Sequence, residues 1–180
     1  MNPSLTDRLC TQCGLCCDGS LFADVELSSQ AEATRVELMG LRIDDDADAR
    51  LMLLPCAALK GTRCSVYAHR PECCRTFECR LLQDTRRGTV SVEQAEEHIA
   101  EALGRIRRVK DLLALLGQRD ARLPLKERCA EALARPAAAG PEAKRNRAAL
   151  EAEMSEVEAL LQKRFLQPES DVRVPASRCP

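Results

Sequence analysis

The chain has 180 residues, 45% of them hydrophobic, and its formal net charge is -1 at pH 7. This length fits one compact domain, or one domain with an appendage. The near-neutral charge argues against a general nucleic-acid-binding protein, which usually carries a basic excess. No stretch approaches the ~18 apolar residues of a membrane span, and the N-terminus lacks the apolar run of a secretory signal. We therefore expect a cytoplasmic protein with no membrane-spanning part.

The chain contains eleven cysteines, and nine of them lie before residue 80. Disulfides are rare in the reducing cytoplasm, and an odd number of cysteines cannot pair completely, so the pattern favours metal ligands over a disulfide framework. Three of the four aromatic residues, Phe22, Tyr67 and Phe77, lie in the same region. A small region with so few large side chains gains stability from a bound metal. The sequence therefore predicts a metal-binding protein.

The first cysteine block has the pattern C-x-x-C-x-x-C-C, from Cys10 to Cys17. A two-residue gap allows both thiolates of a pair to bind one ion, as in a zinc knuckle, and Gly14 suits the tight turn. The block also resembles the start of a ferredoxin run, but Cys17 follows at once where that run has intervening residues. Adjacent side chains diverge, so Cys16 and Cys17 either face two metals or divide into one ligand and one packing residue. The first alternative indicates a multinuclear site.

Two short elements are predicted between the cysteine blocks. Residues 23–27 alternate between apolar and polar side chains, which indicates a strand. Ser29 and Glu32 have the spacing of a capping box, which predicts a helix that ends at Gly40. The aspartate-rich stretch 41–50 lacks the spacing of a calcium-binding loop, and we expect a solvated loop there.

The second group of cysteines follows the apolar run 51–54 and contains Cys56, Cys64, Cys73, Cys74 and Cys79. None of their gaps is a knuckle, so these thiols would have to reach back to the first block. This spacing predicts one site built across the whole region. Residues 63–67 fit a short strand, and Pro71 suits the first position of a helix that carries residues 73–82.

Residues 60–80 contain five basic and two acidic side chains, a balance opposite to that of the whole chain. Basic neighbours lower the pKa of thiols and offset thiolate charge, although an ordinary basic surface explains the excess nearly as well. Arg70 and Arg75 fit a role in neutralising the site or in pairing with nearby glutamates. We favour these roles over bidentate binding of an anionic substrate. His69 fits a place outside the ligand set, because so many thiols are near.

The second half of the chain has a different character. A capping box at Ser91 and Gln94 begins an apolar stripe with alternating steps of three and four residues, which predicts a long helix ending at Gly117. Two more helices are expected, over residues 124–134 and from Pro141 onward. The apolar face of the last helix comprises Leu150, Met154, Val157 and Leu161.

These patterns predict a mostly α-helical protein. A small irregular cysteine-rich metal lobe with few short strands is followed by a helical hairpin or bundle. We place the metal-binding domain at residues 1–88, the helical region at 89–167 and a flexible tail at 168–180. The apolar faces of the C-terminal helices fit packing within the chain, or a surface for a protein partner or self-association. We favour internal packing, because a coiled-coil seam normally needs about three to four heptads.

The cysteine-rich region resembles the CxxCxxCC cysteine-cluster family, also called YkgJ-like. The shared features are the first block, Phe22 to Leu27, Pro55-Cys56, Gly61 to Tyr67 and Arg70 to Cys79, and they span about residues 8–83. The resemblance implies zinc or iron chelation. It also implies eight metal ligands: Cys10, Cys13, Cys16, Cys17, Cys56, Cys64, Cys74 and Cys79. Cys73, Cys129 and Cys179 lie outside the family pattern.

The resemblance does not decide between zinc and iron, because thiolates bind both. Three uses of the metal stay open: structural zinc in an adaptor whose helices bind a partner, an iron–sulfur cluster in a redox protein or enzyme component, and cargo in a metal carrier. Some larger proteins with a similar cysteine domain are linked to lysine methylation of flagellin. This chain has no glycine-rich cofactor loop after a strand, so we do not extend that activity to it. Catalytic residues are unknown.

Overall fold

The structure is a computed structural model that describes residues 4–46, 49–136 and 140–166. The cysteine-rich part contains α1 (Leu5–Cys13), β1 (Asp24–Glu26), α2 (Gln30–Leu38), β2 (Ile43–Asp46), β3 (Ala49–Leu53), β4 (Leu59–Lys60), β5 (Arg63–Cys64), the 3-10 helix η1 (Tyr67–His69), α3 (Glu72–Thr76) and α4 (Arg80–Arg86). The rest forms α5 (Val92–Leu115), α6 (Leu125–Ala134) and α7 (Pro141–Arg164). The predicted fold class, mostly α-helical with a few short strands, is confirmed.

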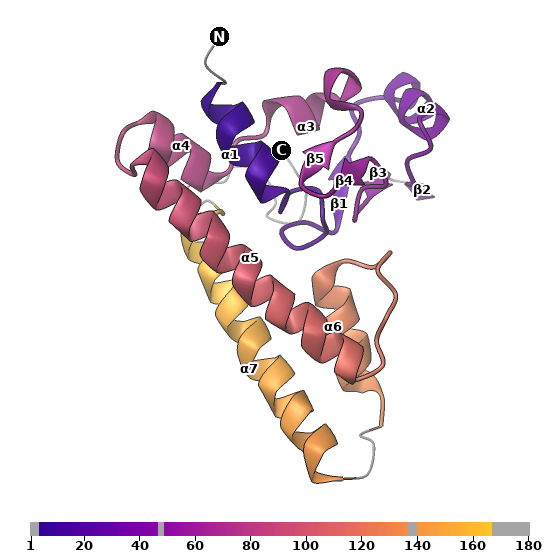
Figure 1. Cartoon of the computed structure of the whole chain (residues 1–180). Coiled ribbons are helices and arrows are strands. Elements are labelled where there is room, and N and C mark those ends of the chain that lie inside the picture. The colour runs from indigo at the N-terminus through magenta and orange to yellow at the C-terminus, as the bar shows by residue number, and fades with distance from the viewer. Residues whose placement is uncertain (1–3, 47–48, 137–139, 167–180) are drawn as a thin grey trace.

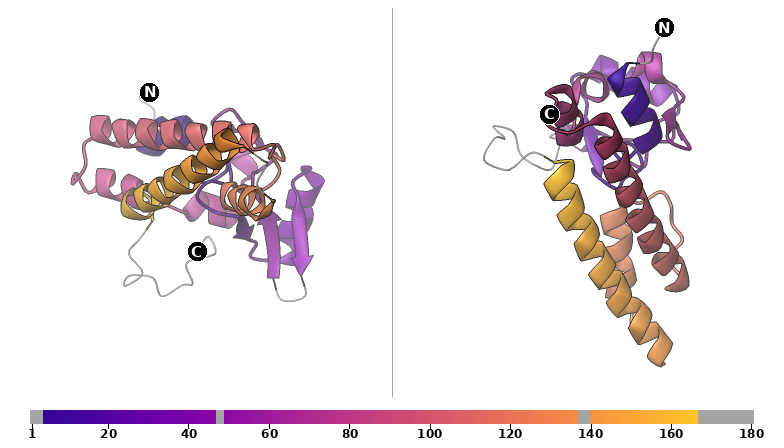
Figure 2. Two further views of the ribbon diagram at one scale, coloured as in Figure 1. Left: turned by 90° about the horizontal axis from the view of Figure 1, so that it is seen from below. Right: turned by 60° about the vertical axis from the view of Figure 1, so that its left-hand side comes forward.

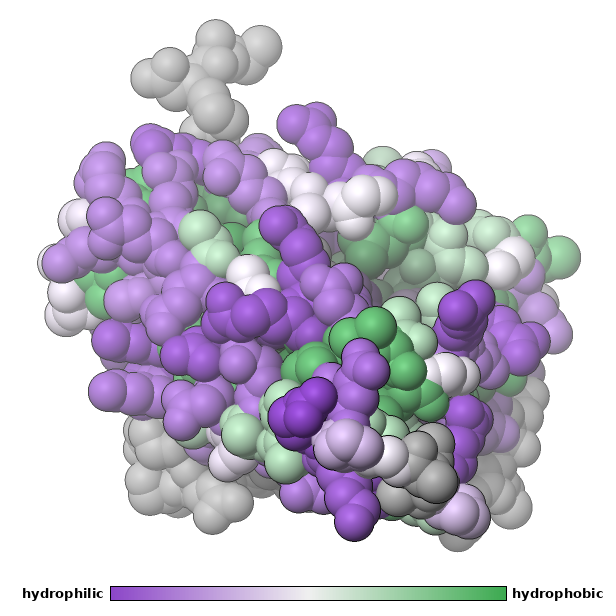
Figure 3. Space-filling model, turned by 60° about the horizontal axis from the view of Figure 1, so that its bottom comes forward, coloured by the Kyte–Doolittle hydropathy of each residue, from purple (hydrophilic) through white to green (hydrophobic). Residues whose placement is uncertain are grey.

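The short elements and the long helices occupy different ends of the molecule (Figure 1). Helices α5 and α7 pack side by side and extend away from the cysteine-rich part, and α6 packs against both of them (Figure 2). Within the described residues, no helix is long and apolar enough to cross a membrane. The face that contains the far ends of these helices is mostly hydrophilic, with a smaller hydrophobic patch (Figure 3).

The first cysteine block begins as a helix. The sequence predicted a knuckle there and gave no sign of the helix. Ser4 caps α1 by accepting a hydrogen bond from the backbone N–H of Asp7 at 3.1 Å. Gly14 ends α1 with a left-handed φ of 70°, and its N–H donates to the carbonyl of Cys10 at 3.2 Å. The tight turn therefore lies after Cys13, and only the second half of the block is a turn.

The aspartate-rich stretch forms part of a sheet, so the prediction of a solvated loop over residues 41–50 was wrong. Strand β3 is the centre of an antiparallel sheet with the order β1-β3-β2. Ile43 pairs with the buried Met52 in the register of β2 and β3. The apolar β3 needs hydrogen-bonding partners on both edges, and β2 supplies the second one. The predicted strand at 23–27 is confirmed as β1.

The helix expected over residues 73–82 is divided into α3 and α4. Phe77 and Cys79 have extended backbones, with ψ angles of 127° and 159°. The ring of Phe77 packs edge-on against Phe22 with centroids 5.2 Å apart, a tertiary contact that spacing along the chain does not reveal. The break places Cys79 at the start of α4. Strand β5 is likewise shorter than expected, because η1 begins at Tyr67.

The C-terminal helices follow their predicted patterns. Helix α5 has the capping box of Ser91 and Gln94, and its stripe buries Ala95, Ile99, Ala102, Ile106, Val109 and Leu113. Helix α7 buries Leu150, Val157 and Leu161, and Met154 is partly buried against the same core. The proposed tail at 168–180, with Cys179, lies outside the described residues.

Two hydrophobic clusters form the core. The first joins α1, α4 and the helices α5, α6 and α7, and it contains Leu9, Leu15 and Leu82. The second lies between the three-stranded sheet, α2 and α3, and it contains Val36, Met52 and Cys73. The first cluster crosses the boundary that we drew at residue 88, and the division of the chain into domains stays a prediction.

Candidate metal centre

All eight cysteines implied by the family resemblance line one cavity of about 390 Å³. Cys73 and Cys129 do not line it; they are buried in the second and first core clusters respectively. None of the ten cysteines that the structure describes forms a disulfide. A second groove of about 630 Å³, between α6, α7 and residues 19–23, has no cysteine in its lining. The thiols therefore gather at one place in the molecule.

Helices α1 and α4 bring three of these cysteines together. Cys10 and Cys13 are three residues apart in α1, so they lie on one helical face. Cys79 is the N-cap of α4, which packs against α1. The side chains of Cys10, Cys13 and Cys79 contact the first core cluster.

A close approach of two backbones fixes the turn that carries Cys16 and Cys17. A Cβ atom on Gly14 would lie 3.3 Å from Cα of Thr62, between β4 and β5. The Thr62 hydroxyl donates a short hydrogen bond to the carbonyl of Thr11 in α1. Glycine is needed here both for the left-handed φ and for this approach.

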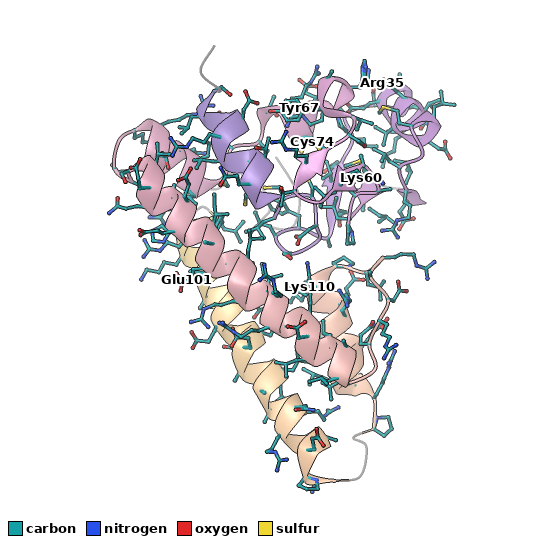
Figure 4. All side chains as sticks on the ribbon, viewed as in Figure 1. Arg35, Lys60, Tyr67, Cys74, Glu101 and Lys110 are labelled. Carbon is teal, nitrogen blue, oxygen red and sulfur yellow. The ribbon has the colours of Figure 1, made fainter. Side chains whose placement is uncertain are left out.

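The long helix α5 also holds this turn. The backbone N–H groups of Cys17 and Asp18 donate to the carbonyl of Gly14 at 2.9 and 3.0 Å. Lys110 of α5 forms an ion pair with Asp18, with Nζ and Oδ2 3.0 Å apart. Figure 4 shows Lys110 on the side of α5 that faces the cysteine-rich part. The C-terminal helices thus help to orient the adjacent cysteines.

The remaining cysteines come from the short elements on the other side of the cavity. The N–H of Cys56 donates to the carbonyl of Cys17 at 2.8 Å. Cys64 lies in β5, opposite Leu59 of β4, and Cys74 lies in α3. The side chains of Cys56, Cys64 and Cys74 contact the second core cluster.

Burial favours the protonated form of most of the cavity thiols when no metal is bound. It raises the pKa of Cys10 to about 11 and that of Cys13, Cys17 and Cys74 to about 12. Burial also raises the pKa of Cys16, Cys56 and Cys79, and at Cys79 the backbone N–H groups of Leu82 and Leu81 oppose that effect. A metal ion that binds here must displace protons from the thiols.

Arg70 is one of the arginines that line the cavity. Its guanidinium carbon lies 3.7 Å from the centroid of the Tyr67 ring, and its Nη1 donates to the carbonyl of Cys74 at 3.1 Å. The Tyr67 hydroxyl donates to Asp7 of α1 at 3.2 Å. Tyr67 and Cys74 lie close together beside α1 in Figure 4. Arg70 therefore links α3 to the helix that carries the first cysteines.

Arg70 also acts on thiols from both sides of the cavity. Burial has the largest effect on the pKa of Cys10, Cys17 and Cys74, and the charge of Arg70 opposes it at each of them. Glu78, a glutamate we considered as an arginine partner, forms its ion pair with Arg86 at 3.0 Å. The neutralising role for Arg70 is the alternative that this geometry favours.

The thiols line the cavity, but their sulfur atoms do not converge on one point. As the side chains stand, no three His, Cys, Asp or Glu residues within the described parts of the chain are placed to hold one ion together. Rotation of cysteine side chains between staggered conformers would bring sulfurs closer. Thiolate donors suit zinc and iron–sulfur clusters alike, so the residues fit such a group. His69 is exposed and is not part of the lining.

Two residues of the C-terminal helices line the cavity, and sequence reasoning did not include them. Ile99 comes from α5, and Phe165 follows the end of α7. Phe165 is 1% exposed, and its carbonyl accepts a hydrogen bond from the N–H of Arg80 in α4 at 2.9 Å. The only signal in the sequence was that Phe165 is the single aromatic residue of its half.

A family model named CxxCxxCC, described as a "putative zinc- or iron-chelating domain", matches residues 9–101. The match includes all eight cavity cysteines and ends within α5. No curated protein and no solved structure matches the chain. The matched region exceeds half of the sequence, so the resemblance found in the cysteine spacing is confirmed.

Proposed function

The chain belongs to the CxxCxxCC family of zinc- or iron-chelating domains, and on that premise we propose that it binds metal through the eight cysteines of its cavity. The observation that supports this proposal is the shared lining. Segments as distant in sequence as α1 and α4 contribute thiols to one cavity. The neighbouring Cys73 and the distant Cys129 lie in the apolar cores instead.

The bound metal would crosslink the short elements that surround the cavity. Thiolates from α1, the β4–β5 hairpin, α3 and α4 would become ligands of the same centre, which stabilises the folded state because the unfolded chain lacks that arrangement. Arg70 would offset part of the thiolate charge. Phe165 and Ile99 would limit the access of water from the side of the helices.

One measurement identifies the element and the type of centre. Elemental analysis and a visible spectrum would be recorded on protein purified without oxygen and without added metal. Zinc without a visible band would indicate a structural zinc module. Iron with inorganic sulfide and a broad visible band would indicate an iron–sulfur protein.

Substitution separates the cavity thiols from the others. Cys13→Ala should lower the metal content, whereas Cys129→Ala, which removes a buried thiol outside the cavity, should leave it unchanged. A folded chain that contains no metal and takes up neither zinc nor iron would overturn the proposal.

A further inference from the structure

The cavity cysteines divide into two groups according to the core that they contact. Cys10, Cys13 and Cys79 pack against the first cluster, together with α5, α6 and α7. Cys56, Cys64 and Cys74 pack against the second cluster, together with the sheet and α2. The thiols thus line two walls of the cavity, one backed by each core cluster, with three thiols on each wall.

Cys16 and Cys17 complete the two groups. The N–H of Cys56 donates to the Cys17 carbonyl at 2.8 Å, which places the backbone of Cys17 beside the second wall. Cys16 also lines the cavity, and the side chains of adjacent residues diverge, which leaves Cys16 for the first wall.

The division has a simple cause in the local backbone. Side chains of adjacent residues point in different directions, and Cys16 and Cys17 lie in the turn that joins α1 to the rest of the cysteine-rich part. Each wall then carries four thiols. Four thiolates are the complete ligand set of a structural zinc ion, and also of one iron–sulfur cluster.

We propose that each chain holds two separate four-thiolate metal centres, one bound by Cys10, Cys13, Cys16 and Cys79 and the other by Cys17, Cys56, Cys64 and Cys74. This inference rests on the proposed metal-binding function and deepens it. Arg70 lies between the two groups, because its Nη1 donates to the carbonyl of Cys74 and its guanidinium lies over Tyr67, whose hydroxyl donates to Asp7 of α1.

Cadmium binding to the full chain tests the partition. The metal-free protein would be loaded with Cd²⁺ alone, the bound metal counted, and its cadmium NMR spectrum recorded. The wild type should bind two ions per chain and give two resonances in the range of sulfur ligands. Cys79→Ser should lose one resonance and keep the other. Cys64→Ser should lose the opposite one.

A matched control uses the thiol next to the site. Cys73 is adjacent to Cys74 in α3 but does not line the cavity. Cys73→Ala should therefore keep both ions and both resonances. If either cavity substitution removes or shifts both resonances together, the eight thiols form one shared centre and the partition is wrong. If the wild type binds no metal at all, the proposed function itself fails.

A second measurement needs no substitution, in case a serine variant does not fold. The wild-type chain would be loaded with Co²⁺ and studied by electron paramagnetic resonance. Two separate centres should give the signal of uncoupled high-spin ions at two per chain. Strong coupling between the ions would show that a thiolate bridges them, and would overturn the partition.

Discussion

Arg70 lies over the ring of Tyr67, with its guanidinium carbon 3.7 Å from the ring centroid, while its Nη1 holds the carbonyl of Cys74. The ring positions the cation, and the cation positions the backbone of a proposed ligand. Groups that orient ligands in this way typically contribute about 10–100-fold to metal affinity.

Replacement of Arg70 by glutamine should therefore weaken metal retention about 10–100-fold. The variant loses the positive charge that opposes the effect of burial on the thiol pKa values. It also loses the hydrogen bond to the carbonyl of Cys74. Transfer of the metal to a coloured chelator would be followed in time. Arg87→Gln is the matched control, because Arg87 is exposed at the end of α4 and does not line the cavity. Equal transfer rates for both variants would contradict the role of Arg70.

A methyl group at Gly14 should destabilise the protein more than the same change at Gly61. Both glycines have left-handed φ angles, 70° and 62°, so alanine costs roughly 1–2 kcal/mol at either position. Only at Gly14 would the new Cβ lie 3.3 Å from a backbone atom, Cα of Thr62, whereas nothing lies within 4 Å at Gly61. Chemical denaturation of both variants measures the difference. A Gly61→Ala effect as large as that of Gly14→Ala would show that the close approach contributes nothing.

Glu32 ties α2 to the start of α3 through a buried carboxylate. It accepts hydrogen bonds from the N–H groups of Ser28 and Glu72, both at 2.9 Å, and from the Ser28 hydroxyl. Glutamine cannot accept all of these bonds, so Glu32→Gln should cost about 1–3 kcal/mol in denaturation experiments. Glu37→Gln, on an exposed position of the same helix, should have little effect.

Because of the Glu32 carboxylate, we also expect the protein to lose stability in acid. Burial acts to raise the pKa of Glu32, but the hydrogen bonds from Glu72 and Ser28 outweigh it, and the pKa is lowered in the folded protein. A lowered folded-state pKa contributes stability above the unfolded value of about 4.3, and the contribution is lost as the pH falls through the folded-state value. Stability measured across this range should fall less in Glu32→Gln than in the wild type. Parallel curves for the two proteins would refute the assignment.

Periodic patterns predicted the long helices because buried apolar residues recur at helical spacing along them. The stripe from Ala95 to Leu113 covers several turns of α5, and the capping box at Ser91 marks its start. Such signals are local, so the sequence contains all that is needed to read them. The cysteine spacing was informative for a similar reason, because order and spacing together identify the family.

The sequence did not predict features that depend on contacts between distant segments. The contact of Phe77 with Phe22 accompanies the break that sets Cys79 at the start of α4. Ile43 pairs with Met52, and strand β2 forms there although the residues that follow Ile43 are polar aspartates. Phe165 reaches the cavity only because α7 packs along α5. The division of the thiols between two walls likewise follows from tertiary packing.

Removal of the metal should loosen the cysteine-rich part before the long helices. Helices α5 and α7 bury their apolar stripes against each other, whereas α1, the β4–β5 hairpin and α3 are short and would be joined through the proposed ligands. Hydrogen exchange after treatment with a chelator should therefore accelerate most at residues 5–20 and 56–79, with smaller changes in α5 and α7. Return of the metal should restore the slow exchange. A uniform acceleration along the chain would mean that the helices depend on the metal as much as the thiol-bearing segments do, through the core cluster that joins them.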